Sequence, residues 1–252
     1  MAKEGYVNLS LKQFPGDTRE MLLARRNFFE RGHYRPLSDA INGLIYTHLH
    51  KVASASPMPI DILDAGCGEG YYTARLQQYL TEELRNVECI GLDISKEAVR
   101  MAAKRYKQAF FVVANLKERL VIADQALHVI TNIFAPRNAD EFARVLTPGG
   151  LLLVVIPGPE HLRQLRSTLH LLDIEEHKQQ HVIDQFAHQF DLITSTSLAY
   201  NLHLSNEEIR QIVMMTPNYW HLSDQTRKAM SDLEQIETEV ACTCLLFQRQ
   251  QG

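Results

Sequence analysis

The sequence of 252 residues contains no run approaching the roughly 20 consecutive apolar residues that a helix needs to cross a bilayer. Residues 1–6 lack the apolar core of a signal peptide, so export is not expected. The formal net charge at pH 7 is only −4, which argues against wholesale coating of nucleic acid but is compatible with a local basic face. We therefore expect a cytoplasmic globular protein that does not associate with membranes.

Cysteine is scarce, with four residues in the chain (Cys67, Cys89, Cys242 and Cys244) and no Cys-x-x-Cys pair. Their spacing is not that of a disulfide-stabilised secreted domain, so reduced thiols are the simpler interpretation. Cys242 and Cys244 lie two residues apart in an expected strand and have no second ligand pair, which favours ordinary core cysteines. The sequence predicts no bound metal.

What the sequence does contain is a change of pattern near residue 55. Before it, one helix is expected to begin near Arg19 and a second to follow Pro36. Residues 54–59, Ser-Ala-Ser-Pro-Met-Pro, are typical of a linker. We expect residues 1–55 to form a helical N-terminal segment and residues 56–252 to form the main domain.

From Ile60 onward, short apolar strands alternate with helices. Such alternation predicts an α/β fold, a mostly parallel sheet with helical crossovers on both faces. Strands are expected at residues 60–64, 88–92, 109–114, 127–132 and 151–156, with helices at 71–84, 96–106 and 139–146. Near the C-terminus, strands at 190–198 and 240–248 on either side of a helix at 206–215 bring the expected sheet to seven strands.

A glycine-rich loop, Asp64-Ala65-Gly66-Cys67-Gly68-Glu69-Gly70, follows the first of these strands. Glycines permit positive φ and let the backbone approach a ligand closely. The free amides of the next helix suit an anionic group such as a carboxylate, and ligands of doubly wound sheets bind at this end of the strands. The alternate glycines do not match the Gly-x-Gly-x-x-Gly of dinucleotide-binding proteins, and the Gly-Lys-Ser/Thr of a P-loop is absent.

A second carboxylate, Asp93, ends the next strand, where it can accept hydrogen bonds from both hydroxyls of a ribose. The loop and this acid together resemble motif I and the second-strand acidic residue of Rossmann-like (class I) methyltransferases. The resemblance implies that S-adenosylmethionine is the cofactor. It also implies the residues that surround it: Asp64, Gly66, Gly68, Glu69, Gly70, Tyr72, Thr73, Asp93 and Ile94.

Two later strands end in residues that can face a ligand. Asn115 follows the third strand, where its amide can meet the adenine edge or cap a turn, and we weigh the two interpretations equally. Phe134 lies in the loop after the fourth strand, on the acceptor side of this fold. It can stack on a planar acceptor, although an aromatic residue beside a strand more often belongs to the core.

Further segments carry a more specific resemblance: Ala24-Arg25-Arg26, Gly32-His33-Tyr34-x-Pro36-Leu37, Ala135-Pro136, Pro157-Gly158-Pro159-x-His161-Leu162 and Met215-Thr216-Pro217. With residues 1–8, they are similar to the 23S ribosomal RNA (guanine-N1-)-methyltransferases along almost the whole chain. The resemblance implies that Tyr34 helps to close the N-terminal segment over the cofactor and that His161 contacts the same ligand. Without it, Tyr34 would be a packing residue and His161 a surface or capping histidine.

The sequence departs from that family in two places. The family normally begins with a zinc ribbon, and the resemblance starts just after it. The segment between Asn8 and Pro15 is also shorter than in the family and lacks a basic cluster found there. Both departures concern RNA contact. The N-terminal helices carry five arginines that could form a phosphate-binding face: Arg19, Arg25, Arg26, Arg31 and Arg35. The alternative, which we weigh equally, is a solvated helix surface on which these arginines pair with Glu20 and Glu30.

Three functions stay open. The first is methylation of N1 of a guanine in 23S ribosomal RNA, favoured by the extent of the resemblance. The second is methylation of a small molecule, favoured by the acidic net charge and the missing ribbon. The third is a non-catalytic ribosome- or RNA-binding protein that retains the fold, against which the glycine loop and Asp93 weigh. No residue is assigned as a catalytic base, and a homodimer is left open.

Overall fold

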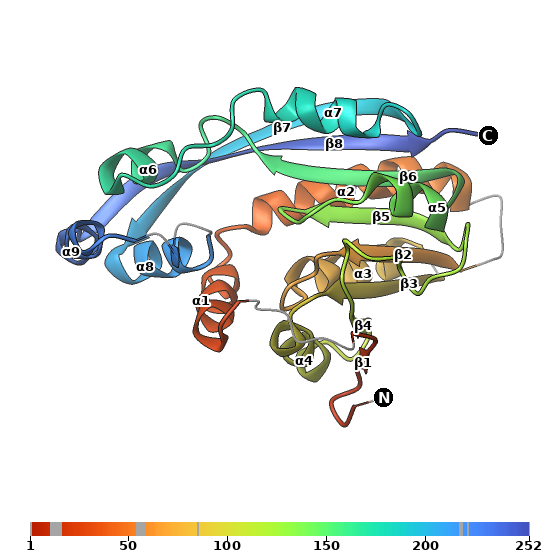
Figure 1. Ribbon diagram of the computed structural model, residues 1–252, viewed down its shortest axis with the longest axis horizontal. Coiled ribbons are helices and arrows are strands. Elements are labelled where there is room, and N and C mark those ends of the chain that lie inside the picture. Colours follow the sequence, from red (N-terminus) through yellow and green to blue (C-terminus); the bar gives the residue numbers. More distant parts are fainter. Residues whose placement is uncertain are drawn as a thin grey trace.

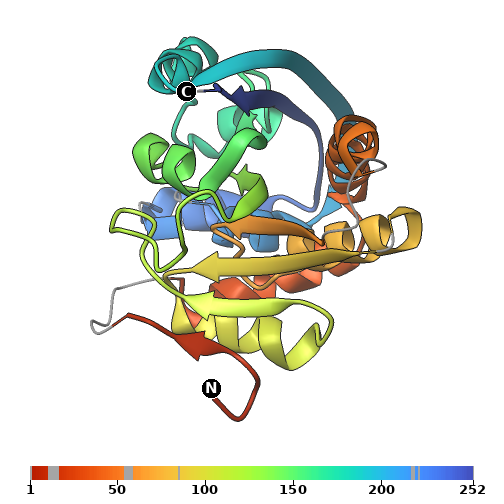
Figure 2. The same cartoon turned by 90° about the vertical axis from the view of Figure 1, so that its right-hand side faces the viewer.

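The computed structural model describes residues 2–10, 17–53, 59–84, 86–216, 219–220 and 222–251, with the backbone alone for 50–53. Its centre is an eight-stranded sheet in the order β1-β4-β3-β2-β5-β6-β8-β7. Helices cover both faces of the sheet, and β1 and β7 form its two edges (Figure 1, Figure 2). The expected α/β class and helix-covered sheet are confirmed, with one strand more than the seven expected. None of the helices in these ranges is long and apolar enough to cross a membrane.

The parallel half of the sheet is formed by alternating strands and helices. In chain order these are β2 (Ile60–Ala65), α3 (Tyr71–Glu83), β3 (Val87–Asp93), α4 (Lys96–Arg105), β4 (Phe110–Val113), β5 (Leu127–Ile133), α5 (Ala139–Val145) and β6 (Leu146–Pro157). Neighbouring strands from β4 through β6 pair in parallel. Nearly every residue of β2 and β5 is buried, as expected of strands covered on both faces. The predicted bounds hold to within a few residues, except that β6 begins at Leu146 instead of 151.

The C-terminal part adds a long antiparallel hairpin. Its elements are α6 (Arg163–Leu169), α7 (Lys178–Phe186), β7 (Phe190–Ser205), α8 (Asn206–Met214), α9 (Asp224–Asp232) and β8 (Gln235–Arg249). Strand β8 lies between β6 and β7 and is antiparallel to both. Most of β7 is exposed, and the strand continues seven residues beyond its expected end at 198.

The N-terminal segment packs on the same core as the sheet. It contains β1 (Val7–Asn8), which pairs in parallel with β4, and the expected helices α1 (Arg19–Glu30) and α2 (Arg35–Ala53). Thr18 begins α1 by accepting a hydrogen bond from the amide of Met21 at 3.3 Å. Fully buried α2 side chains join sheet residues in one hydrophobic cluster. The proposed division at residue 55 stays a prediction, because residues 54–58 lie outside the described part of the chain.

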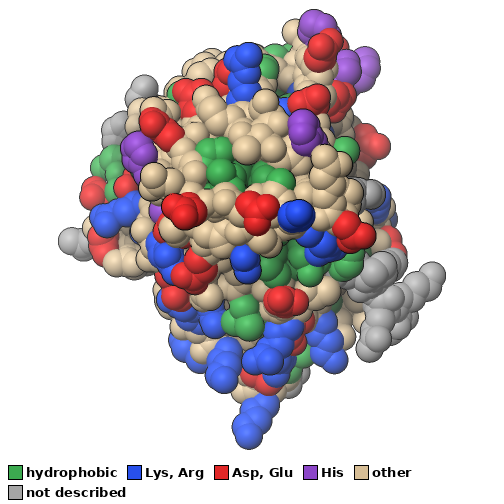
Figure 3. Space-filling model, turned by 90° about the vertical axis from the view of Figure 1, so that its left-hand side faces the viewer, with side chains coloured by type: hydrophobic (Ala, Val, Ile, Leu, Met, Phe, Trp, Pro, Cys, Tyr) green, Lys and Arg blue, Asp and Glu red, His purple; other side chains and the backbone are tan. Residues whose placement is uncertain are grey.

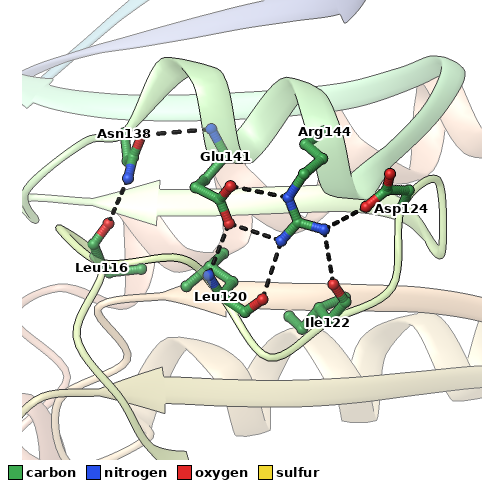
Figure 4. Close-up of polar contacts among 7 residues, drawn as sticks. All are labelled: Leu116, Leu120, Ile122, Asp124, Asn138, Glu141 and Arg144. Atoms are coloured by element: carbon green, nitrogen blue, oxygen red, sulfur yellow. Dashed lines mark hydrogen bonds and ion pairs between the residues drawn. The ribbon is translucent and has the colours of Figure 1, made fainter.

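The connection between β4 and β5 is held against α5 by a polar network around Arg144 (Figure 4). Its guanidinium donates to both carboxylate oxygens of Glu141 at 2.8 and 2.7 Å and to Asp124 at 2.6 Å. It also donates to the carbonyl oxygens of Leu120 and Ile122 at 3.0 and 2.9 Å. The hydrogen bonds from Arg144 lower the pKa of Glu141. One side chain thus supplies a hydrogen-bond donor to two carbonyl oxygens of the loop.

We expect Arg144→Gln to lower the free energy of unfolding by roughly 2 to 3 kcal/mol, because charged hydrogen bonds and two loop carbonyls lose their donor. Urea denaturation monitored by circular dichroism measures the change. The matched control is Arg100→Gln, which removes an exposed ion pair with Glu97 on α4 and should change stability little. Equal losses in both variants would contradict the structural role of the network.

Candidate functional site

A cavity of about 840 Å³ lies at the carboxyl ends of the parallel strands, the side toward which β5 and β6 point in Figure 1. Its wall combines the loop after β2, the end of β3, the loop after β5 and the end of β6 with parts of α1 and α8. Seven of the twelve predicted cofactor residues line it: Tyr34, Gly66, Gly68, Glu69, Tyr72, Asp93 and His161. The other five do not: Asp64, Gly70, Thr73, Ile94 and Asn115.

The glycine loop is tightly packed against its neighbours. Gly66, Gly68 and Gly70 all have positive φ, at 93°, 55° and 86°. A Cβ at Gly66 would lie 2.3 Å from the Cβ of Ala135, in the loop after β5. Since that distance is impossible, only glycine at position 66 lets the two loops come together.

Asp64 stabilises the glycine loop through buried hydrogen bonds. Its carboxylate accepts hydrogen bonds from the hydroxyls of Thr73 at 2.5 Å and Thr131 at 2.9 Å. It is 2 % exposed, and burial raises its pKa to about 6. The structure therefore gives Asp64 and Thr73 a supporting position, in which they join the first turn of α3 to β2 and β5.

Asp93 lines the cavity directly. Its two carboxylate oxygens accept the amides of Gly68 at 2.9 Å and Ser95 at 2.8 Å, which keeps the carboxylate in a fixed orientation. Each oxygen has a further lone pair for a ligand hydroxyl. Asn115, by contrast, caps a turn by accepting the amide of Lys117 at 3.0 Å.

Two buried polar atoms in the cavity wall have no hydrogen-bond partner among the described residues, Oε1 of Glu69 and the hydroxyl of Tyr72. Burial raises the pKa of Glu69 to about 7, and the positive charge of Arg25 opposes this rise. Leaving such groups unpaired is unfavourable by about 1 to 3 kcal/mol each. Both atoms therefore fit a polar ligand in the cavity.

Arg25 lies inside the cavity and does not belong to an outer basic face. Its Nη2 is 2.6 Å from a carboxylate oxygen of Asp17 and 3.4 Å from the carbonyl oxygen of Met215. Burial alone would lower the pKa of Arg25, but neighbouring carboxylates, above all that of Asp17, raise it. Sequence reasoning missed this position, because the helical spacing of α1 does not reveal which arginine faces inward.

The other four arginines of that group form ion pairs on the surface: Arg19 with Glu97, Arg26 with Glu30, Arg31 with Glu207 and Glu208, and Arg35 with Asp39. Figure 3 shows the side of the molecule that lies at the left of Figure 1. Lys and Arg side chains gather on its lower part, with acidic side chains among them. These four arginines are therefore ion-paired, as the alternative interpretation expected. Of its two expected partners only Glu30 is used, and Glu20 is in none of the ion pairs of the described residues.

Tyr34, Phe134 and His161 form an aromatic cluster in the cavity wall. The ring centroid of Phe134 lies 6.5 Å from that of Tyr34 and 6.0 Å from that of His161. Nδ1 of His161 accepts the amide of Ala241 at 3.3 Å, and burial lowers the pKa of this histidine to about 4. The neutral ring therefore carries its proton on Nε2 and donates to the Tyr34 hydroxyl at 3.3 Å. The hydroxyl hydrogen of Tyr34 is left for another acceptor.

The loop after β5 is anchored by Asn132, a residue that sequence reasoning did not single out. Its side-chain amide donates to the carbonyl oxygens of Ala65 at 3.0 Å and Pro136 at 2.9 Å. Phe134, between these contacts, has a φ of 52° and is 43 % exposed. A non-glycine residue in this conformation at a cavity wall is typical of a functional position.

Comparison with known proteins is consistent with this geometry. Residues 62–150 match a family model described as a methyltransferase domain. The chain is 34% identical over 239 residues to the 23S rRNA (guanine(748)-N(1))-methyltransferase of Streptomyces fradiae, covering 94% of this chain and 82% of that protein. It is 35% identical over 230 residues to a putative 23S rRNA (guanine-N(1)-)-methyltransferase of Micromonospora griseorubida, covering 88% and 77%.

Among solved structures, loganic acid methyltransferase with SAH has a TM-score of 0.63 at 12% identity, covering 96% of this chain and 99% of that one, which supports the fold alone. The sequence relatives carry the assignment further. The chain belongs to the 23S ribosomal RNA (guanine-N1-)-methyltransferase family and is an S-adenosylmethionine-dependent methyltransferase.

Proposed function

We propose that this protein methylates N1 of a guanine in 23S ribosomal RNA. The observation that carries the proposal is the contact between Gly66 and Ala135, which brings the glycine loop and the loop of Phe134 to one cavity. A methyl donor and a planar acceptor can therefore lie next to each other. Proximity and orientation of this kind can remove much of the barrier to a displacement reaction. The names of the relatives supply the substrate.

The cavity fits the cofactor. We assign the ribose hydroxyls to Asp93, the amino-acid end to the unpaired carboxylate of Glu69 and to Arg25, and the close backbone approach to Gly66 and Gly68. Bound S-adenosylmethionine supplies an electrophilic methyl group on a positively charged sulfur. Three carboxylates around one arginine (Asp17, Glu69 and Asp93 around Arg25) make the cavity favourable for a cation.

The acceptor side is aromatic. Guanine N1 carries a proton and is tied up in Watson–Crick pairing, so the target base has to be unpaired or flipped out before it enters the cavity. Phe134 offers an exposed ring on which such a base can stack. The Tyr34 hydroxyl, which accepts from His161, can donate its hydrogen to a ligand oxygen that gains negative charge.

The biological setting follows from this substrate. Ribosomal RNA is methylated where ribosomes are assembled, so we propose a cytoplasmic location. Association into a homodimer stays open.

Transfer of a tritiated methyl group tests the function. The purified protein is incubated with labelled cofactor and either an unmodified 23S ribosomal RNA transcript or a pooled metabolite extract. We expect label in the transcript, and nuclease digestion followed by mass analysis should identify it as N1-methylguanine. Label confined to the metabolites would favour a small-molecule methyltransferase. Cofactor binding without transfer to any substrate would favour a non-catalytic RNA-binding protein.

Asp93→Asn should weaken S-adenosylmethionine binding roughly 10- to 100-fold, because a neutral amide accepts the ribose hydroxyls less strongly than a carboxylate. Isothermal titration calorimetry measures the affinity, and circular dichroism checks that the fold is kept. Glu88→Gln, at an exposed carboxylate of β3 that does not line the cavity, is the control. An unchanged affinity in Asp93→Asn would refute the ribose contact.

Glu69→Gln should stabilise the cofactor-free protein at pH 8 but not at pH 4.5. The pKa of this carboxyl rises from 4.5 to about 7 on folding, so its ionisation opposes folding. The penalty is absent below pH 4.5, grows up to pH 7 and reaches at most about 3 kcal/mol. Urea denaturation at both pH values measures it, with exposed Glu82→Gln as the control.

The same Glu69→Gln variant should bind S-adenosylmethionine more weakly at pH 8, because the unpaired carboxylate is gone. A gain in stability that is equal at both pH values would contradict the raised pKa of Glu69. An unchanged affinity for the cofactor would contradict the assignment of Glu69 to the ligand.

A further inference from the structure

The cavity wall carries two cations, Arg137 and Lys178, that the cofactor does not account for. Arg137 comes three residues after Phe134 in the loop following β5, and Lys178 begins α7; both line the cavity. Nε of Arg137 donates to Oε1 of Gln185 at 3.0 Å. Among the described residues, neither Arg137 nor Lys178 has an ion-pair partner within 4 Å, and the two terminal nitrogens of Arg137 have no acceptor.

The lack of an ion pair sets Arg137 apart from the other arginines of this region. Arg166, which also lines the cavity, donates to Asp173 at 2.9 Å and to the carbonyl oxygen of His161 at 2.9 Å. Arg137 is half-buried, and burial lowers its pKa although the more distant charge of Glu175 opposes the change. A partly desolvated guanidinium with free donors favours an anionic ligand.

Two carboxylates that also line the cavity, Asp173 and Glu175, are already engaged. Asp173 pairs with Arg166 at 2.9 Å, and Glu175 accepts from Nδ1 of His181 at 2.7 Å. Neither carboxylate lies within ion-pair distance of Arg137 or Lys178. The positive charge of these two residues is therefore available to a ligand.

The loop after β5 contributes both an aromatic ring, Phe134, and a guanidinium, Arg137, to the cavity wall. The amide of Phe134 donates to the carbonyl oxygen of Val155 at 3.1 Å, which holds the unusual backbone conformation and the exposed ring in place. A nucleotide offers the matching pair of groups, a flat base and a phosphodiester. Aromatic rings stack on unpaired bases, and the planar guanidinium of arginine binds phosphate through two parallel hydrogen bonds.

We propose that Arg137, assisted by Lys178, binds the phosphodiester group of the nucleotide whose base stacks on Phe134. This contact selects a base within an RNA chain over a free base or nucleoside. The inference rests on the proposed function, because it takes the acceptor to be a nucleotide of RNA.

Three variants (Arg137→Gln, Lys178→Gln and Arg137→Lys) and a control test the phosphate contact. Arg137→Gln and Lys178→Gln each remove one charge, whereas Arg163→Gln removes an exposed arginine of α6 that pairs with Glu160 and does not line the cavity. Binding of an unmodified 23S ribosomal RNA transcript is measured over a series of salt concentrations in the presence of S-adenosylhomocysteine. Methylation of the same transcript then gives kcat and KM.

For Arg137→Gln we expect about tenfold weaker RNA binding near 0.1 M salt and a slope of log K against log salt that is smaller by roughly 0.7 to 0.9. KM for the transcript should rise with kcat little changed, because the contact is made equally in the ground and transition states. Lys178→Gln should show the same effects more weakly, and Arg137→Lys should restore part of the binding. Calorimetry should give unchanged cofactor affinity in all variants.

If the wild type methylates the transcript while Arg137→Gln keeps the wild-type salt slope and KM, the phosphate contact is overturned and the proposed function stands. An effect of Arg163→Gln as large as that of Arg137→Gln would also overturn it, since the loss would then reflect net charge alone. If the wild type transfers no methyl group to the transcript, the proposed function fails and this inference fails with it.

Discussion

The site depends on the contact between Gly66 and Ala135, the point at which the loop after β2 meets the loop after β5. Any side chain at position 66 would force the loops apart, and the donor and acceptor sides of the cavity would separate with them. Buried polar groups hold the two loops in register. Asp64 joins β2 to β5 through Thr131, and Asn132 joins the end of β5 to the carbonyl oxygen of Ala65.

This arrangement places several carboxylates in one poorly hydrated region. Burial raises the pKa values of Asp64, Glu69 and Asp93, so ionisation at these positions opposes folding of the cofactor-free protein. Arg25 offsets part of this charge from α1. A positively charged ligand with hydroxyl and ammonium donors would offset the negative charge that remains. The features that favour the cofactor are therefore the same ones that limit the stability of the protein without it.

The sequence alone predicted the parallel half of the fold well, because each buried strand there is a short apolar run followed by a turn or a capped helix. The glycine loop and Asp93 were recognisable because their spacing places them at neighbouring strand ends. The short helices α6, α7 and α9 were not predicted: they have seven to nine residues, and α9 buries none of them. The end of β7 was missed, although the alternation of Leu198, Tyr200, Leu202 and Leu204 with polar or small residues is typical of a strand with one exposed face.

Within the site, the sequence indicated which types of residue are present better than which side chains face the cavity. Nothing in the pattern of α1 separates Arg25, which enters the cavity, from Arg26, which pairs with Glu30 on the surface. The roles of Asp64 and Asn115 likewise depend on which hydrogen bonds form, and those bonds join segments distant in the chain or compete with a local turn. Such choices are made by tertiary packing and cannot be read from local spacing.

The strand order of the hairpin has a consequence for folding during translation. Strand β7 is made before β8 and, in the described part of the chain, pairs with no other strand. Residues 190–205 therefore gain this ladder partner only after residues 235–249 have been translated. The half of the sheet that carries the glycine loop and Asp93 is complete much earlier, at residue 157. On the ribosome, the nascent chain can therefore assemble its cofactor-binding half first, while an uncompleted strand waits for the partner that arrives some 30 residues later.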